Sequence, residues 1–134
     1  GNHWNHPHEA AVKILTQGLI RLGLIDATLE EALEKELYKP FYMHRTGHWL
    51  GLDVHDVGDY KIAGEWRLLE PGMVLTVEPG IYVSPSNKDV AKKWRGIGIR
   101  IEDDVLVTKT GCRVLTEAVP KEINEIEALM AGDN

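Results

Sequence analysis

Apolar residues recur at helical spacing in the first part of the chain. Over residues 7–23 they return every three or four positions, which predicts an amphipathic helix. Pro7 suits the first helical position, and Gly23 suits a left-handed residue just after the helix. The apolar positions of this predicted helix are Ala11, Ile14, Leu15, Leu19 and Leu22.

A second helix is predicted over residues 27–37, which read ATLEEALEKEL. Thr28 and Glu31 have the spacing of a capping box, in which each side chain satisfies a backbone N–H of the other residue. Pro40 would stop the helix, because proline has no N–H to donate. The charged positions are typical of a solvated face rather than a partner site. The apolar stripe consists of Leu29, Ala32, Leu33 and Leu37.

Beyond Pro40 the pattern indicates strands. Residues 71–83, PGMVLTVEPGIYV, are rich in β-branched side chains and predict a buried strand that is interrupted at Pro79-Gly80. Residues 95–115 alternate, with three isoleucines on one face of the predicted strand (Ile97, Ile99 and Ile101). The pairs Asp103-Asp104 and Thr110-Gly111 are typical of the turns of an antiparallel meander.

The end of the chain returns to a helical pattern. A helix is predicted over residues 120–130, and SPSNKD at residues 84–89 is predicted to be an exposed loop. The element order is two helices, several antiparallel strands and one helix, which predicts the α+β class. At 134 residues the chain has the length of one domain. The apolar side of the last helix contains Ile123, Ile126, Leu129 and Met130.

Composition narrows the classes of partner. The formal net charge of −6 and the lack of a basic run argue against nucleic-acid binding, and no apolar run approaches the roughly 20 residues of a membrane helix. Cys112 is the only cysteine, so no intrachain disulfide is possible. With no export signal evident, we expect a cytoplasmic protein. Because the first residue is Gly1, we also expect a processed chain or a piece of a longer one.

Two glutamates stand out within the predicted strands. Glu78 follows Val77 in mid-strand. Glu102 lies opposite the isoleucine face, two residues after Arg100, in a segment that is expected to be largely buried. A carboxylate in a buried segment needs an ion pair, hydrogen bonds or a metal. The simpler interpretation is that Glu102 and Arg100 are surface residues or an ordinary ion pair.

Three of the six histidines are close together in MHRTGHWLGLDVHDVG, residues 43–58. Glycines and alternating apolar residues disfavour a helix here. His44, His48 and His55 would then each project independently and contribute one imidazole to a pocket wall. One histidine alone is more often a hydrogen-bonded core residue than a ligand. Three histidines together with two strand glutamates predict a metal site. An oxygen-rich site with one imidazole ligand suits manganese, with zinc and cobalt also possible.

Three longer motifs resemble the C-terminal part of aminopeptidase P, the Xaa-Pro aminopeptidase. They are YMHRTGHWLGLDVHDVGDY, LEPGMVLTVEPGIYV and WRGIGIRIEDDVLVT, and the resemblance runs from about residue 8 to residue 130. It implies the second half of a pita-bread fold, shared with methionine aminopeptidase and prolidase. It also implies a dinuclear site, usually of manganese, and peptides with proline in second position as substrates.

The resemblance assigns metal ligation to three residues. His48 is similar to the family's histidine ligand, and Glu102 to the glutamate that bridges both metals. Glu78 is similar to the glutamate that binds one metal and takes a proton from the attacking water. These three would form the metal site.

The resemblance also assigns substrate roles. His44 and His55 are similar to the histidines that line the substrate pocket and stabilise the reacting carbonyl or the tetrahedral intermediate. Arg100 is similar to an arginine that helps to hold the substrate and Glu102. Trp49 and Tyr82 are expected to pack around the site.

Two aspartate ligands of the family's site have no counterpart in this chain. Asp26 lies in a turn between the two predicted helices and outside any strand motif. The chain would therefore contain the C-terminal portion of the catalytic domain over residues 1–134 and at most one weak metal site. Alternatively, it is a truncated, non-catalytic pita-bread module that acts by binding or self-association. Exposed strand edges favour a homo-oligomer in either case.

Overall fold

A computed structural model describes residues 1–132 of the chain. In chain order the elements are α1 (His6–Arg21), α2 (Leu29–Glu34), β1 (Lys61–Ile62), β2 (Glu65–Trp66), β3 (Val74–Val77), β4 (Gly80–Tyr82), the short 3₁₀ helix η1 (Lys92–Trp94), β5 (Gly98–Arg100), β6 (Asp103–Thr108), β7 (Gly111–Val114) and α3 (Ile123–Ala131). Helices and antiparallel strands occur in the predicted order, which confirms the α+β class.

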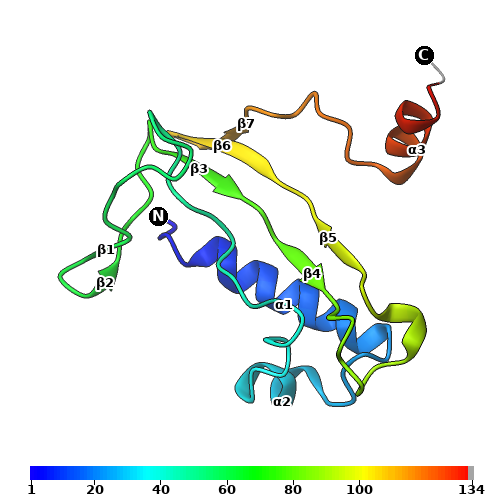
Figure 1. Cartoon of the computed structure of the whole chain (residues 1–134). Coiled ribbons are helices and arrows are strands. Elements are labelled where there is room, and N and C mark those ends of the chain that lie inside the picture. Colours follow the sequence, from blue (N-terminus) through cyan, green and yellow to red (C-terminus); the bar gives the residue numbers. More distant parts are fainter. Residues whose placement is uncertain (133–134) are drawn as a thin grey trace.

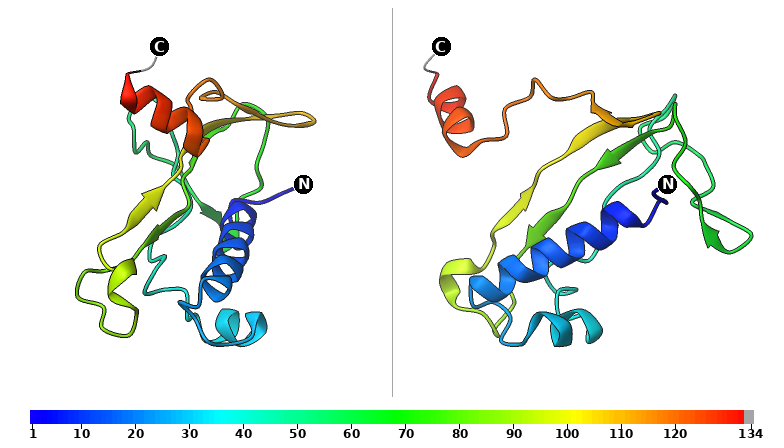
Figure 2. Two further views of the ribbon diagram at one scale, coloured as in Figure 1. Left: turned by 90° about the vertical axis from the view of Figure 1, so that its right-hand side faces the viewer. Right: turned by 180° about the vertical axis from the view of Figure 1, so that it is seen from behind.

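A long antiparallel ribbon forms the centre of the molecule (Figure 1). β3 pairs with β6 and β4 pairs with β5, so the chain runs out along β3 and β4 and returns along β5 and β6. β7 extends the sheet at one end through a tight hairpin with β6. Helix α1 lies along the ribbon in Figure 1 and in both views of Figure 2.

Two apolar clusters hold these elements together. One joins α1 and α2 to the far end of the ribbon through Leu19, Ala32, Phe41 and Val83. The other joins the start of the chain to β3, with Trp4, Trp49 and Leu75 as its buried members. Because each cluster contains residues distant in sequence, both tie the ends of the ribbon to the first half of the chain.

The strand predictions are partly confirmed. The first strand is interrupted between β3 and β4, as predicted, and the turn before Gly111 joins β6 to β7. The predicted turn at Asp103-Asp104 is wrong, because both residues pair with β3 inside β6. The Thr116 hydroxyl donates to an Asp103 carboxylate oxygen at 2.6 Å, which stabilises an acidic residue in a strand. The chain reverses direction instead between β4 and β5, and this connection contains the exposed loop predicted at residues 84–89.

The predicted helices are all present, but their ends and their buried faces differ from the prediction. The buried face of α1 consists of Val12, Thr16 and Leu19, whereas Ile14 and Leu22 are exposed. Gly23 takes the predicted left-handed conformation with φ of 70°.

Helix α2 is shorter than predicted. The Thr28 hydroxyl accepts from the backbone N–H of Glu31, which confirms one half of the capping box. The carboxylate of Glu31 accepts instead from Lys35 Nζ at 2.7 Å. The helix ends at Glu34, and Glu36 has a positive φ of 53°, which α-helical geometry excludes. Leu37 therefore packs against the core from a turn and not from the helix.

One face of the ribbon and the last helix are exposed. All of β5 is exposed, and Ile97, Ile99 and Ile101 lie on the surface, so the expected burial of this segment is wrong. Helix α3 has no buried residue and stands apart from the rest of the molecule in Figure 1 and in the right view of Figure 2. None of the helices in residues 1–132 combines the length and the apolar character needed to cross a bilayer.

Candidate metal centre

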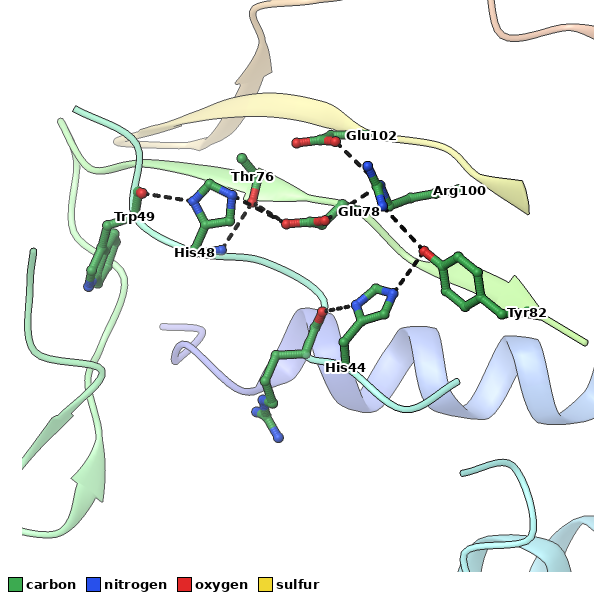
Figure 3. A network of polar contacts seen from close by, with 9 residues as sticks. His44, His48, Trp49, Thr76, Glu78, Tyr82, Arg100 and Glu102 are labelled. Atoms are coloured by element: carbon green, nitrogen blue, oxygen red, sulfur yellow. Dashed lines mark hydrogen bonds and ion pairs between the residues drawn. The ribbon is translucent and has the colours of Figure 1, made fainter. Parts of the chain in front are cut away.

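Three chain segments bring the predicted ligands together (Figure 3). His48 comes from the segment that runs beside β3, Glu78 follows β3, and Glu102 lies between β5 and β6. One potential ligand atom of each lies within 4.8 Å of the others, and residues 1–132 contain no second such group of His, Cys, Asp or Glu. Residues 54 positions apart in sequence thus share one focus.

His48 is fixed by its backbone and by one ring nitrogen. Its backbone N–H donates to the Thr76 hydroxyl at 3.0 Å, and its carbonyl accepts from the Thr76 N–H at 3.0 Å. The ring Nδ1–H donates to the Trp49 carbonyl at 2.9 Å. Nε2 then carries the lone pair and faces Glu78 Oε1 at 3.3 Å.

Glu78 is held from three directions. Its Oε1 accepts from the Thr76 hydroxyl at 3.2 Å, and its Oε2 lies 3.7 Å from Arg100 Nε. Its backbone N–H donates to the Thr46 carbonyl at 2.7 Å. The side chain is only 17% exposed, so this carboxylate is largely shielded from water.

Glu102 has less support. Its carboxylate lies 3.6 Å from Arg100 Nε, and the side chains of Glu102 and Arg100 are 40% and 50% exposed. Arg100 therefore lies between the two glutamates and neutralises part of their mutual repulsion. Solvent screens ion pairs that are this exposed, so Arg100 orients Glu102 only weakly.

His44 and Tyr82 extend the polar network beside the three predicted ligands (Figure 3). The Nδ1–H of His44 donates to the Arg45 carbonyl at 2.7 Å, and its Nε2 accepts from the Tyr82 hydroxyl at 3.0 Å. Arg100 Nη1 reaches the same hydroxyl at 3.5 Å. Tyr82 thus links His44 to Arg100, which is a closer involvement than the packing role expected from the sequence.

His55 lies in an exposed loop that folds back over the site. The edge of its ring meets the ring of His48, with the two centroids 4.2 Å apart. The side chain of Trp49, in contrast, packs away from the site against Trp4 and Leu75. Only the Trp49 carbonyl contacts a predicted ligand, so the expectation that its ring surrounds the site is wrong.

A buried hydrogen-bond network supports residues 43–50, which run beside β3 and are called the histidine segment. The hydroxyl of Thr46 makes hydrogen bonds with the Tyr42 hydroxyl and, at 2.9 Å, with His8 Nδ1 on α1. Burial, with a contribution from the nearby Arg45, lowers the pKa of His8 from 6.5 to about 4. Burial also raises the pKa of Tyr42. Both side chains are therefore neutral near pH 7 and anchor the segment without charge.

Known proteins match this chain over most of its length. The profile of metallopeptidase family M24 matches residues 3–109. The chain belongs to metallopeptidase family M24.

Relatives within the family are close in sequence and structure. The chain is 51% identical to a Xaa-Pro aminopeptidase of Haemophilus influenzae over 97% of its length, which is 30% of that relative. It superposes on 30% of the Pseudomonas aeruginosa aminopeptidase PepP structure with a TM-score of 0.95 and 65% identity, over 98% of this chain. A zinc-substituted Escherichia coli aminopeptidase P in complex with product matches 92% of this chain and 28% of that one, with a TM-score of 0.84 and 50% identity.

These comparisons confirm the resemblance to aminopeptidase P and the pita-bread fold. The M24 chain spans about 30% of the length of the curated relatives it matches. Membership in a metallopeptidase family also implies the use of a divalent metal.

The donor set of the site fits a divalent cation. The lone pair of His48 Nε2 and the carboxylate of Glu78 are both acceptors and face each other at 3.3 Å, so they repel unless a proton or a cation lies between them. Donation of the other ring N–H to a backbone carbonyl is the usual arrangement of metal-binding histidines. One imidazole with two carboxylates suits manganese, cobalt or zinc.

The structure brings together most of the residues predicted from the sequence. His44, His48, Glu78, Arg100 and Glu102 share one network, and His55 joins it through a ring contact. Their assignment to metal and substrate roles stays a prediction.

Sequence reasoning missed a role for Thr76 and understated that of Tyr82. Thr76 lies two residues before Glu78, and this spacing places both on one face of a strand. That spacing was the available signal.

Proposed function

We propose that this chain is part of a metalloaminopeptidase that releases the N-terminal residue from peptides with proline in second position. This proposal rests on the convergence of His48, Glu78 and Glu102 in a chain that is 51% identical to a Xaa-Pro aminopeptidase. From the single cysteine, we place the enzyme in the cytoplasm.

The metal would be held by His48 Nε2 and the carboxylates of Glu78 and Glu102. Manganese is our proposed metal, because oxygen-rich sites with one imidazole suit it. When bound, the divalent cations of the complete site would polarise the scissile carbonyl and lower the pKa of the attacking water.

The surrounding residues have distinct proposed roles. Glu78 accepts the proton of the attacking water, which its shielded position next to His48 supports. His44 and His55 line the substrate pocket and stabilise the oxyanion that develops on the substrate. Arg100 helps to hold the substrate and keeps Glu102 turned toward the site.

The chain would supply only part of the catalytic domain. Three protein ligands are too few for the dinuclear site that the resemblance implies, and the relatives are more than three times as long as the matched segment. We therefore place residues 1–134 in the C-terminal portion of the domain and assign the remaining ligands to residues outside them. The isolated chain would bind at most one metal weakly and would not turn over substrate.

Two measurements test this function. In the isolated chain, titration with Mn²⁺ followed by the EPR signal of free Mn²⁺ should detect a site that His48→Ala abolishes and that Asp89→Asn, in the exposed loop, leaves unchanged. In the complete gene product, Glu78→Gln should lower the kcat for an Xaa-Pro peptide by about 10²–10⁴-fold. Unchanged kcat in Glu78→Gln would contradict the proposed role.

Self-association is a second candidate function, favoured by one observation. Ile99, Ile101 and the apolar side of α3 are exposed in residues 1–132. Large apolar side chains that are exposed on a strand or helix face commonly mark an interface. Light scattering of the chain should then give the mass of a homo-oligomer, and Ile99→Lys should shift it to the monomer mass. A monomer at all concentrations would exclude this candidate.

A further inference from the structure

A single hydroxyl connects two of the three predicted ligands. Thr76 is at the centre of β3, and its side chain is 2% exposed. Its oxygen accepts the backbone N–H of His48 at 3.0 Å and donates its proton to Glu78 Oε1 at 3.2 Å. The two partners lie on different chain segments, so this hydroxyl couples the histidine segment to the end of β3.

The direction of these bonds is set by chemistry. A backbone N–H only donates and a carboxylate only accepts, so the hydroxyl of Thr76 must accept from His48 and donate to Glu78. Hydrogen bonds to a charged group are stronger than neutral ones. The proton of Thr76 therefore selects one orientation of the Glu78 carboxylate, in which Oε1 faces the ring of His48 and Oε2 faces Arg100.

A comparison with Thr16 separates this role from ordinary packing. Thr16 is also fully buried, but its hydroxyl donates to the Val12 carbonyl at 2.6 Å within its own helix. That bond organises nothing beyond one helical turn. The hydroxyl of Thr76 contacts only groups of the candidate metal centre.

We infer that Thr76 is a positioning residue of the metal centre, whose hydroxyl holds His48 and Glu78 in the geometry that binds a divalent cation. This inference rests on the proposed function, since it takes these residues as ligands. Without the hydroxyl, Glu78 Oε1 would lose the donor that orients it and the His48 N–H would lose its acceptor. Loss of a hydrogen-bond partner that orients a metal ligand lowers metal affinity by about 10–100-fold.

The experiment measures Mn²⁺ affinity in the 134-residue chain by the EPR signal of free Mn²⁺. Thr76→Val keeps the size and β-branching of the side chain and should weaken binding about 10–100-fold. Thr76→Ser retains the hydroxyl and should restore affinity to within a few-fold. Thr16→Val removes an equally buried hydroxyl elsewhere and should leave affinity unchanged. Thermal unfolding confirms that each variant is folded, and Thr76→Ala is the replacement if Thr76→Val is not.

The outcomes separate this inference from the proposed function. If His48→Ala abolishes binding while Thr76→Val binds as tightly as the unsubstituted chain, the positioning role is overturned and the metal centre stands. If Thr16→Val weakens binding as much as Thr76→Val does, the effect is general destabilisation and the role is likewise overturned. If the unsubstituted chain binds no better than His48→Ala, the metal centre itself fails, and the role of Thr76 fails with it.

Discussion

The two halves of the central ribbon differ in how firmly they hold their glutamate. β3 has β6 on one side and the histidine segment on the other, and Leu75 and Thr76 inside it are buried. Within residues 1–132, β5 pairs only with β4, and all of its residues are exposed. Glu78, which follows β3, is held by Thr76 and His48 in addition to the exposed Arg100. Glu102, which follows β5, is held within residues 1–132 by Arg100 alone.

This difference indicates that the chain organises one side of the metal centre by itself. His48 and Glu78 are oriented by hydrogen bonds from buried or partly buried groups, which resist rotation. Glu102 is half-exposed and has more freedom to move. Substitutions in β3 and in β5 test this contrast.

The largest expected effect is on stability. Leu75→Ala removes a side chain that is 4% exposed and packs against two tryptophans, and it should lower the free energy of unfolding by about 2–5 kcal/mol. Ile99→Ala, at 61% exposure in β5, should change it by less than about 0.5 kcal/mol. Urea unfolding of both variants measures the difference. Equal effects would show that the two halves are equally well packed.

A close backbone approach at Gly47 should produce the next largest effect. A Cβ at Gly47 would lie 2.0 Å from the Thr76 carbonyl oxygen, and backbone has little freedom to move away. Gly47→Ala should therefore cost about 1–3 kcal/mol of stability and displace His48. The matched control is Gly18→Ala inside α1, where a Cβ meets nothing within 4 Å and should stabilise the chain by roughly 0.5–1 kcal/mol. A stable Gly47→Ala with normal Mn²⁺ binding would contradict this packing.

The smallest expected effect is a dependence of stability on pH. The pKa of His8 is about 4 in the folded chain and 6.5 as the ordinary value, so between these pH values the unfolded chain binds the proton more readily. The contribution of His8 is therefore present above pH 6.5 and is lost as the pH falls toward 4. His8→Gln should flatten the fall in Tm between pH 7 and pH 4, measured by circular dichroism. Parallel Tm curves for both proteins would exclude this contribution.

Much of the fold was predictable because its signals are local. Thr28 caps α2, Gly23 ends the first helical segment, and Pro79 interrupts the strand, each through backbone chemistry of one or two residues. The turn predicted at Asp103-Asp104 failed because the partner that stabilises Asp103 in a strand, Thr116, is 13 residues away.

Burial was harder to predict than secondary structure. Alternation in residues 95–115 identified the isoleucine face, yet Ile97, Ile99 and Ile101 are exposed in the structure. A pattern tells which residues share a face, but whether that face is covered depends on what packs against it. The same applies to α3, whose amphipathic pattern has no buried side in this chain.

The sequence by itself determined the family and the candidate site residues: three histidines in a glycine-rich segment, two strand glutamates and the motifs of a metallopeptidase family. Only the tertiary structure decided which of them meet, and that Thr76 lies between His48 and Glu78. The physical reason is the distance along the sequence over which each interaction acts. Residue type and spacing govern helices and strands over a few positions, whereas the site depends on pairing between segments 24 to 54 positions apart, which no local pattern specifies.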